Sequence, residues 1–402
     1  MTVVMTTATV TRAADWPQFR GPERNGNSPE TGLMQSWPEG GPKELWSSDD
    51  VGHGWASVAV VGGKVYTTGV FGDELRVTAL DASGKTLWQK PIDKATGGGG
   101  FKGARPTPTV DGDRLYVLSD AGRLVCLERD GGKEVWGVDV LKEYGAENAR
   151  HSLGESVLVD GRRVICTPAG KASVVALDKT TGKQLWAAPP VDPRTAYVSA
   201  QVTDCGGVRQ IVAMTGKILF GVTDDGSKVL WTHPRETPWE VNINAPHIRD
   251  GVLYVSSGGK FGTEALKLVA ADGEVRVQPL WNSKELDDNL GGMALVGERL
   301  IGCCSELPKG LTALDIRTGK QVYKNAAIGE SSIIVGDGRL YCLEHTGRML
   351  LVNPVDGSVC GSFGLPKARK SQERLWAHPA ISDGRLYVRH ESTVSVYDIK
   401  TP

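Results

Sequence analysis

The chain has 402 residues with 46 basic and 47 acidic side chains, and this balance argues against nucleic acid or an anionic membrane as the main partner, since both select a basic excess. No apolar run approaches the length of a bilayer-spanning helix, and the composition is too apolar for a disordered chain and too rich in glycine for a coiled coil. Glycine, at 51 residues, and tryptophan, at 11 against 6 phenylalanines, are both in excess, and the predicted fold has to place them.

The first 40 residues lack the pattern of the rest of the chain. Residues 1–14 are small and uncharged until Arg12, and they are interpreted either as the remnant of an export signal ending at Ala14 or as a disordered tail. Residues 15–40 are rich in Pro, Gly and Asn and have no hydrophobic period, which predicts an irregular strap over one face, anchored by Trp16 and Phe19. We expect an exported protein, periplasmic or secreted.

From residue 41 onward, one aromatic residue recurs every 40–50 residues. Tryptophan stands at positions 46, 88, 136, 186, 231 and 281, and Tyr323 and Phe363 continue the series. The residues directly before each aromatic repeat as well, as in ALDKTTGKQLW (176–186) and ALDIRTGKQVY (313–323). Each copy is two apolar runs joined by a Gly-bearing turn, which predicts a β-hairpin that ends in the aromatic residue.

About 30 residues before each aromatic lies another hairpin, such as PTVDGDRLYVL (108–118) or PAISDGRLYVR (379–389). Two hairpins per repeat make a four-stranded antiparallel blade, with strands called A to D from the axis outward. Eight first hairpins but only seven complete second hairpins are present, and the strand with Trp46 (41–46) has no blade before it. The sequence therefore predicts an all-β, eight-bladed β-propeller in one domain, residues 41–402, closed by an N-terminal strand. The aromatic series is expected to pack blade against blade.

The loops that lead into each strand A converge on the axis of such a ring, and they carry polar and aromatic side chains. We expect them to line a polar axial funnel, the default ligand site of this fold. The candidate ligand-binding residues are His53, Trp55, Arg105, Arg150, His151, Glu155, Tyr197, Gln201, Trp239, Asn242, Asn244, Glu330, Trp376 and His378.

Two pairings among these candidates have chemical meaning. Arg150 with Arg105 can clamp a carboxylate or a phosphate, because guanidinium forks match planar anions. His151 with Glu155 can transfer protons. Neither pairing has a motif behind it, so no catalytic residue is assigned, and no spacing indicates a metal site.

The pattern A-x-D-x-x-T-G-K-x-x-W, clearest at Ala176 to Trp186, resembles the tryptophan-docking repeat of propellers of the pyrroloquinoline-quinone (PQQ) type. That superfamily contains eight-bladed quinoprotein alcohol dehydrogenases and non-enzymatic assembly lipoproteins of the BamB type. Residues 15–33 (DWPQFRGPERNGNSPETGL) also look like the leader of secreted PQQ-like repeat proteins of planctomycete-type bacteria. The resemblance implies the fold over roughly residues 41–400 and leaves the function open.

Seven cysteines are present, none with zinc-ligand spacing, and Cys126, Cys166 and Cys342 are interpreted as small core residues. Cys303 and Cys304 are adjacent, and quinoprotein dehydrogenases carry such a pair as a vicinal disulfide against the cofactor. Here the pair ends a predicted strand B in the sixth blade, whereas the family pair belongs to an early blade. The alternative interpretation is that one cysteine faces each side of the strand.

Two function classes remain. The first is an extracytoplasmic scaffold or ligand-binding propeller of the BamB type. It is favoured because the four strands of a blade take up nearly all of the 40–50 residues of each repeat, which leaves little chain for active-site loops. The second is an enzyme that uses the funnel, either a dehydrogenase with PQQ and Ca²⁺ or a carbohydrate-active enzyme. The expected partner is a small molecule or sugar in the funnel, or a protein on a propeller face, with the chain acting as a monomer.

Overall fold

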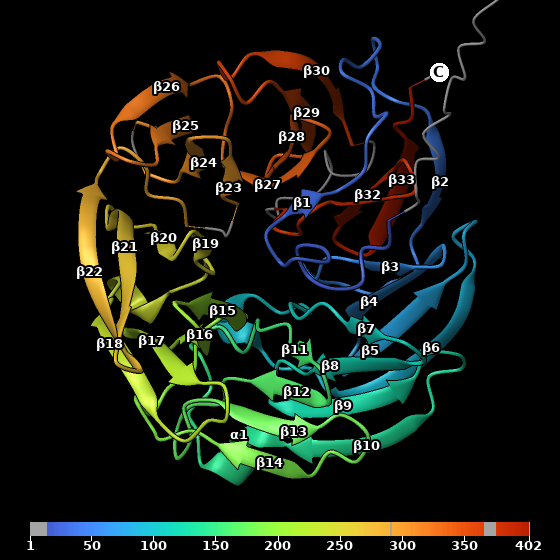
Figure 1. Ribbon diagram of the computed structural model, residues 1–402. Coiled ribbons are helices and arrows are strands. Elements are labelled where there is room, and N and C mark those ends of the chain that lie inside the picture. The colour runs from blue at the N-terminus through green and yellow to red at the C-terminus, as the bar shows by residue number, and fades with distance from the viewer. Residues whose placement is uncertain (1–13, 290–291, 307, 366–374, 402) are drawn as a thin grey trace, which may run out of the picture.

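Glycine-bearing turns fold the chain into eight antiparallel sheets that stand as blades around one axis (Figure 1). The structure is a computed structural model and describes residues 14–289, 292–306, 308–365 and 375–401. The expectation for residues 1–13 therefore lies outside the described residues. The predicted eight-bladed propeller is confirmed: seven sheets have four strands, and one has a fifth strand that runs parallel to its neighbour.

In the first four blades the strands follow one another from the axis outward. Their bounds are, for blade one, β3 (Ala59–Val61), β4 (Lys64–Phe71), β5 (Glu74–Leu80) and β6 (Thr86–Lys94); for blade two, β7 (Thr109–Asp111), β8 (Arg114–Leu118), β9 (Arg123–Glu128) and β10 (Glu134–Asp139); for blade three, β11 (Leu158–Asp160), β12 (Arg163–Cys166), β13 (Val175–Asp178) and β14 (Gln184–Ala187); and for blade four, β15 (Gln201–Cys205), β16 (Val208–Met214), β17 (Ile218–Thr223) and β18 (Val229–Pro234).

The last four blades continue the ring, and blades seven and eight each take in one strand from the N-terminal segment. The bounds are, for blade five, β19 (His247–Arg249), β20 (Val252–Ser257), β21 (Gly262–Ala271) and β22 (Glu274–Ser283); for blade six, β23 (Ala294–Val296), β24 (Arg299–Cys304), β25 (Gly310–Asp315) and β26 (Gln321–Asn325); for blade seven, β27 (Ser331–Gly336), β28 (Arg339–Glu344), β29 (Arg348–Val352) and β30 (Val359–Gly364), with β1 (Asn27–Ser28); and for blade eight, β31 (Ala380–Ser382), β32 (Arg385–His390), β33 (Thr393–Asp398) and β2 (Glu44–Ser48).

Helices among the described residues are short: α1 (Val140–Tyr144) and the 3₁₀ turns η1 (Gly98–Gly100) and η2 (Pro238–Glu240). None of them has the length and apolar character needed to cross a bilayer.

Ring closure follows the prediction. Strand β2 pairs antiparallel with β33, with Trp46 opposite Val396, so blade eight joins a strand from the N-terminal part of the chain to its last three strands (Figure 1). Arg389 at the end of β32 is 1% exposed and binds blade eight to blade one through the hydroxyl of Thr67 and the carbonyl of Gly52. Closure therefore rests on a backbone ladder and on a buried guanidinium.

The repeated aromatic residues form the layer between the blades. In the turn before Trp186, Asp178 receives hydrogen bonds from the amides of Thr180 and Thr181. In seven of the eight repeats the glycine of the turn lies under the aromatic ring of the preceding blade, whereas the ring of Trp231 lies against Gly221 of its own blade. The ring and glycine pairs are Trp46 with Gly84, Trp88 with Gly132, Trp136 with Gly182, Trp186 with Gly226, Trp281 with Gly319, Tyr323 with Gly357 and Phe363 with Gly41.

The strap does not stay on the surface. Trp16 is fully buried and bridges Val60 in blade one, and β1 extends blade seven beside β27. Between them the chain enters the axial channel, because Arg20 contacts the carbonyl of Met293 in front of blade six and Arg24 contacts the carbonyl of Val157 in front of blade three. The N-terminal segment thus closes the channel from inside.

Candidate functional site

The loops that run from strand D of one blade to strand A of the next meet around the axis and enclose a cavity of about 430 Å³. We call the side on which these loops lie the D–A face. Aromatic rings line the part of the cavity next to blades eight, one and two, and the strap forms its floor.

The aromatic wall consists of Trp55, Phe101 and Trp376. The rings of Trp55 and Trp376 have centroids 5.0 Å apart and planes inclined by 42°, and Phe101 lies 5.5 Å from Trp376 at 50°. His53 extends the wall behind Trp55 at 5.5 Å. Because the three rings pack against one another, they form one continuous curved surface and leave no slot between parallel faces.

Phe101 reaches the wall because a run of four glycines precedes it. Gly98, Gly99 and Gly100 have φ values of 55°, 57° and 96°, in the left-handed region that other residues avoid. A Cβ at Gly99 would lie 2.6 Å from the carbonyl oxygen of Arg150, so this turn must pack without side chains. Phe101, 44% exposed, stands at the mouth of the cavity.

Arg105 lies beside the wall and is fixed by its own loop. Its guanidinium donates to the carbonyls of Gly103 at 2.9 Å and of Phe101 at 2.6 Å, and it lies over the ring of Trp55 at 5.2 Å. Burial lowers the pKa of Arg105, and the charge of Asp120 opposes that effect. Arg105 remains a cation at neutral pH, and the loop fixes its position.

Phe19 and Arg20 of the strap form the floor. The ring of Phe19 stands edge-on to His378, with centroids 5.1 Å apart. Arg20 is 5% exposed, has a φ of 62°, and donates to Nδ1 of His378 at 3.2 Å and to the carbonyl of Met293 at 2.5 Å. A left-handed arginine is unusual, and this conformation directs its side chain into the axis.

Burial sets the charges on this floor. Burial lowers the pKa of Arg20 to about 10, with Asp288 opposing the effect, so the guanidinium stays charged at neutral pH. Burial, and then the charge of Arg20, lower the pKa of His247 to about 3, which keeps that imidazole neutral. The floor therefore presents one fixed cation among neutral rings.

On the opposite side of the cavity, Tyr197 accepts a hydrogen bond from the amide of His151 at 3.0 Å. Burial raises the pKa of Tyr197, so its hydroxyl stays protonated at neutral pH. Asn244 donates to the carbonyls of Ser256 and Asp288 and so holds the loops of blades five and six together. These contacts fix the shape of the cavity.

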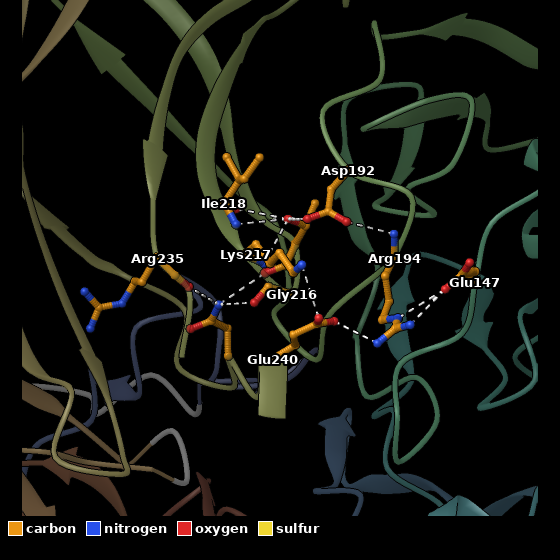
Figure 2. Close-up of polar contacts among 10 residues, drawn as sticks. Glu147, Asp192, Arg194, Gly216, Lys217, Ile218, Arg235 and Glu240 are labelled. Carbon is orange, nitrogen blue, oxygen red and sulfur yellow. Dashed lines mark hydrogen bonds and ion pairs between the residues drawn. The ribbon is translucent and has the colours of Figure 1, made fainter. Parts of the chain in front are cut away.

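A second hollow, of about 670 Å³, adjoins the cavity at Pro238 and Gly259. We call it the basic groove, because five cationic side chains and two glutamates line it: Arg150, Arg194, Lys217, Lys260 and Lys284 with Glu236 and Glu240. Figure 2 shows Arg194 between Glu147 and Glu240, at 2.9 Å and 2.8 Å, with Lys217 on the other oxygen of Glu240 at 3.4 Å. Positive charge remains in excess.

The structure brings only some of the candidate residues together. Of the fourteen, seven line the cavity: Trp55, Arg105, His151, Tyr197, Asn244, Trp376 and His378. His53 lies behind Trp55, and Arg150 lines the basic groove. The side chain of Trp239 lies outside the part of the chain that the structure describes.

Four polar candidates do not line the cavity. Glu155 is 1% exposed and accepts from the amide and hydroxyl of Thr167. Asn242 is fully buried and donates to the carbonyls of Thr215, Gly216 and Arg235. Glu330 pairs with His345 at 3.4 Å, and Gln201 is a ladder residue of β15. These side chains hold neighbouring loops, so the cavity is less polar than the loop sequences suggest.

Neither of the two pairings expected from the sequence is formed. Arg105 lies in the cavity and Arg150 in the basic groove, so they do not flank one anion. Glu155 is directed to Thr167 in its own blade, away from the cavity that His151 lines.

Sequence reasoning missed Arg20 and Phe101 as lining residues. Arg20 meets His378 across 358 positions, and no local pattern indicates such a contact. Phe101 had a signal, because a run of four glycines before an aromatic residue marks a tight turn that presents a ring.

Comparison with known proteins gives one family match. A family model described as outer membrane protein assembly factor BamB matches residues 73–325. The outer membrane protein assembly factor BamB of Yersinia pestis is 24% identical over 260 residues, which are 63% of this chain and 64% of that protein. A quinoprotein ethanol dehydrogenase of Pseudomonas putida is 24% identical over 246 residues, 55% of this chain and 36% of that protein. The match thus spans just under two thirds of the Yersinia relative.

Solved structures share the fold. BamB of Moraxella catarrhalis superposes with a TM-score of 0.58 at 14% identity, covering 86% of this chain and 99% of that one. The quinohemoprotein alcohol dehydrogenase of Comamonas testosteroni superposes with a TM-score of 0.68 at 13% identity, covering 96% and 81%. At these identities the likeness concerns the fold, which an assembly factor and a dehydrogenase share.

Proposed function

Because the chain belongs to the family described as outer membrane protein assembly factor BamB, we propose that it is a non-catalytic recognition propeller that binds a ligand or partner at its D–A face. The observation that carries this proposal is the cavity on the axis, where a curved aromatic wall meets a floor supplied by the strap. Concave aromatic surfaces with a few fixed polar groups are typical of binding sites.

The ionisable side chains near the axis support recognition over catalysis. The side chains of Glu155 and Asn242 make hydrogen bonds to neighbouring loops, and His378 accepts a hydrogen bond from Arg20. The cations Arg20 and Arg105 are held by backbone carbonyls. A general acid or base needs a proton-accepting group directed at the substrate, whereas these groups hold the shape of the cavity.

The described residues do not fit PQQ with Ca²⁺, the cofactor pair of the quinoprotein relatives. A calcium site needs several oxygen ligands, and within the described residues no three His, Cys, Asp or Glu side chains gather as metal ligands. Glu155 and Asn242, two oxygen-bearing candidates from the axial loops, are directed elsewhere.

The adjacent cysteines do not fit the cofactor either. Cys303 and Cys304 are free and buried, and they belong to two different core clusters on opposite sides of β24. A vicinal disulfide under a quinone would have to face the cavity, whereas these thiols pack into the seams between blades. The interpretation of one cysteine on each side of the strand describes their placement.

An extracytoplasmic location is part of the proposal. It is supported by the names of the curated relatives, which describe outer membrane assembly factors, and by the small residues that precede Ala14. A protein partner on the D–A face agrees with those names, and a small ligand agrees with the cavity.

The test is reconstitution of the purified chain with PQQ and Ca²⁺, followed by an absorbance spectrum after gel filtration and a dye-linked alcohol oxidation assay. We expect no stoichiometric quinone and no turnover. A bound quinone spectrum together with alcohol oxidation would overturn the recognition proposal.

A further inference from the structure

We propose that the cavity and the basic groove together form one elongated site for an acidic oligosaccharide, whose rings lie on the aromatic wall and whose carboxylates or sulfates meet the arginines and lysines. This inference rests on the proposed recognition function and names the chemical class of its ligand.

The aromatic wall fits sugar rings. A pyranose presents patches of C–H groups on its faces and hydroxyls around its edge, so it packs on an indole face and remains polar at its rim. Trp55, Trp376 and Phe101 give three ring surfaces in succession, inclined by 42° and 50°. A flat fused-ring ligand needs parallel faces on both sides, and this wall offers a curved surface on one side.

The charge of the cavity favours an acidic ligand, because two arginines, Arg20 and Arg105, line it against one carboxylate, Glu306. Arg105 is held beside the ring of Trp55, 5.2 Å from its centroid, and Arg20 forms the floor. Guanidinium groups bind carboxylate and sulfate through paired N–H donors. A sugar ring on Trp55 therefore brings its acidic substituent to a cation that the loop already positions.

The basic groove extends the same selection beyond the cavity. Its five lysine and arginine side chains exceed its two glutamates, and Glu240 is shared between Arg194 and Lys217. Lys260 is exposed, and Lys284 lies 5.6 Å from the ring centroid of Phe261. The two hollows meet at Pro238 and Gly259, so one chain of several sugar units passes from ring wall to groove.

Three residues along this path have left-handed backbone conformations. Arg20, which lines the cavity, and Glu240 and Lys260, which line the groove, have φ values of 62°, 57° and 64°. Residues other than glycine adopt this conformation only where the surrounding structure holds them. The backbone therefore fixes the direction in which these three side chains leave their loops.

Acidic glycan is favoured over the neighbouring classes because it uses both features together. A neutral glycan uses the rings and makes no ion pair with the lysines and arginines, and an acidic peptide without aromatic or ring groups uses the cations and leaves the wall exposed. These alternatives are the comparison arms of the test.

The experiment is isothermal titration calorimetry of the purified full chain with tetragalacturonate as the probe, against neutral tetragalactose and tetraglutamate. We expect binding of the acidic sugar only, weakened at least tenfold by raising NaCl from about 50 mM to about 500 mM. Tighter binding of the neutral sugar or of the acidic peptide, or no binding of tetragalacturonate, overturns the inference.

Three variants locate the site. Trp376→Ala in the wall and Lys260→Gln in the groove should each weaken tetragalacturonate binding, by about tenfold for the ring and about threefold for the exposed lysine. Lys133→Gln is the matched control, because Lys133 is 79% exposed on the outer hairpin of blade two. Equal effects of the groove variant and the control would overturn the groove assignment, while unchanged binding in Trp376→Ala would overturn the wall.

Failure of this inference is separable from failure of the recognition function. Binding of tetragalactose or tetraglutamate that Trp376→Ala abolishes would keep the cavity as a recognition site and reject the acidic glycan. Quinone binding with turnover would reject the recognition function itself.

Discussion

Glu155 shows how a polar residue of an axial loop can serve the fold. Its carboxyl is 1% exposed and accepts two hydrogen bonds from Thr167. Burial raises its pKa to about 7, while the Thr167 contacts and the charge of Arg24 oppose the effect. The folded state thus favours the protonated acid over a pH range in which the unfolded chain has released the proton.

This residue makes a testable contribution to stability. The folded pKa of about 7 lies above an unfolded value of about 4.3, so the contribution is complete below the unfolded pKa and is lost as the pH rises through about 7. Between about pH 5 and pH 8 the parent chain should lose about 2–3 kcal/mol more unfolding free energy than Glu155→Gln. Urea titrations of both chains measure this difference. Parallel pH profiles would show that Glu155 ionises normally in the fold.

At the residue scale, the sequence indicates which residues can bind but not which ones do. Glu155, Asn242 and Trp55 all stand in irregular loops, where no period of two or 3.6 residues tells which way a side chain points. Asn242 turned inward to three carbonyls, and Trp55 turned to the cavity. Only the packing of neighbouring loops decides between these outcomes.

At the scale of the element, the contact of an aromatic ring with a turn glycine holds successive blades together. Gly182 has a φ of 72°, and a Cβ there would lie 2.7 Å from the indole of Trp136. The Trp136 indole also donates to the carbonyl of Lys179 at 3.1 Å. The repeat motif encodes this contact, which is why the blades could be counted from the sequence.

The energetic cost of a clash with Trp136 can be measured separately from the cost of placing a side chain at a positive φ. Gly182→Ala should cost more stability than Gly161→Ala, although both positions have positive φ, because a Cβ at Gly161 meets nothing within 4 Å. The shared conformational cost is about 1–2 kcal/mol, and the clash with Trp136 adds to it at Gly182 alone. Chemical denaturation of the two variants gives the comparison. Equal losses of stability in the two variants would mean that the Trp136 side chain moves aside at no energetic cost.

The strap is the element whose role the sequence described least. Its irregular sequence predicted a strap over one face, anchored by Trp16 and Phe19. Trp16 is fully buried, and the segment after it also enters the axial channel. There Arg20 contacts the loop in front of blade six and Arg24 contacts the loop in front of blade three, both far from the strap in the sequence. Local composition carries no information about such a path.

Substitution of Trp16 and of Trp376 should affect stability to different degrees, because the first anchors the strap and the second lines the cavity. Trp16→Ala should destabilise the chain by about 3–5 kcal/mol, because it opens a cavity in the core between the strap and blade one. Trp376→Ala, at a half-buried ring in the cavity wall, should cost less stability while it removes binding surface. Thermal unfolding of both variants tests this order. A larger loss of stability in Trp376→Ala than in Trp16→Ala would show that the aromatic wall serves the core of the fold.

At the scale of the whole molecule, ring closure converts a chain of local hairpins into one body. The blades form from contacts close in sequence, whereas β2 pairs with β33 and Arg389 binds Gly52 across 337 positions. The count of first and second hairpins predicted this closure, because one outer strand was missing at one end and present at the other. The interior of the ring was not predictable in the same way, since its lining comes from loops of seven blades and from the strap.

The central proposal is that an acidic oligosaccharide binds at the D–A face around the axis. Hydrogen–deuterium exchange of the full chain with and without saturating tetragalacturonate tests it most directly. We predict protection in residues 52–57, 98–105, 149–154 and 375–378, which form the wall and rim of the cavity. Protection confined to the outer strands β6, β10 and β14, or no protection at all, would contradict the account.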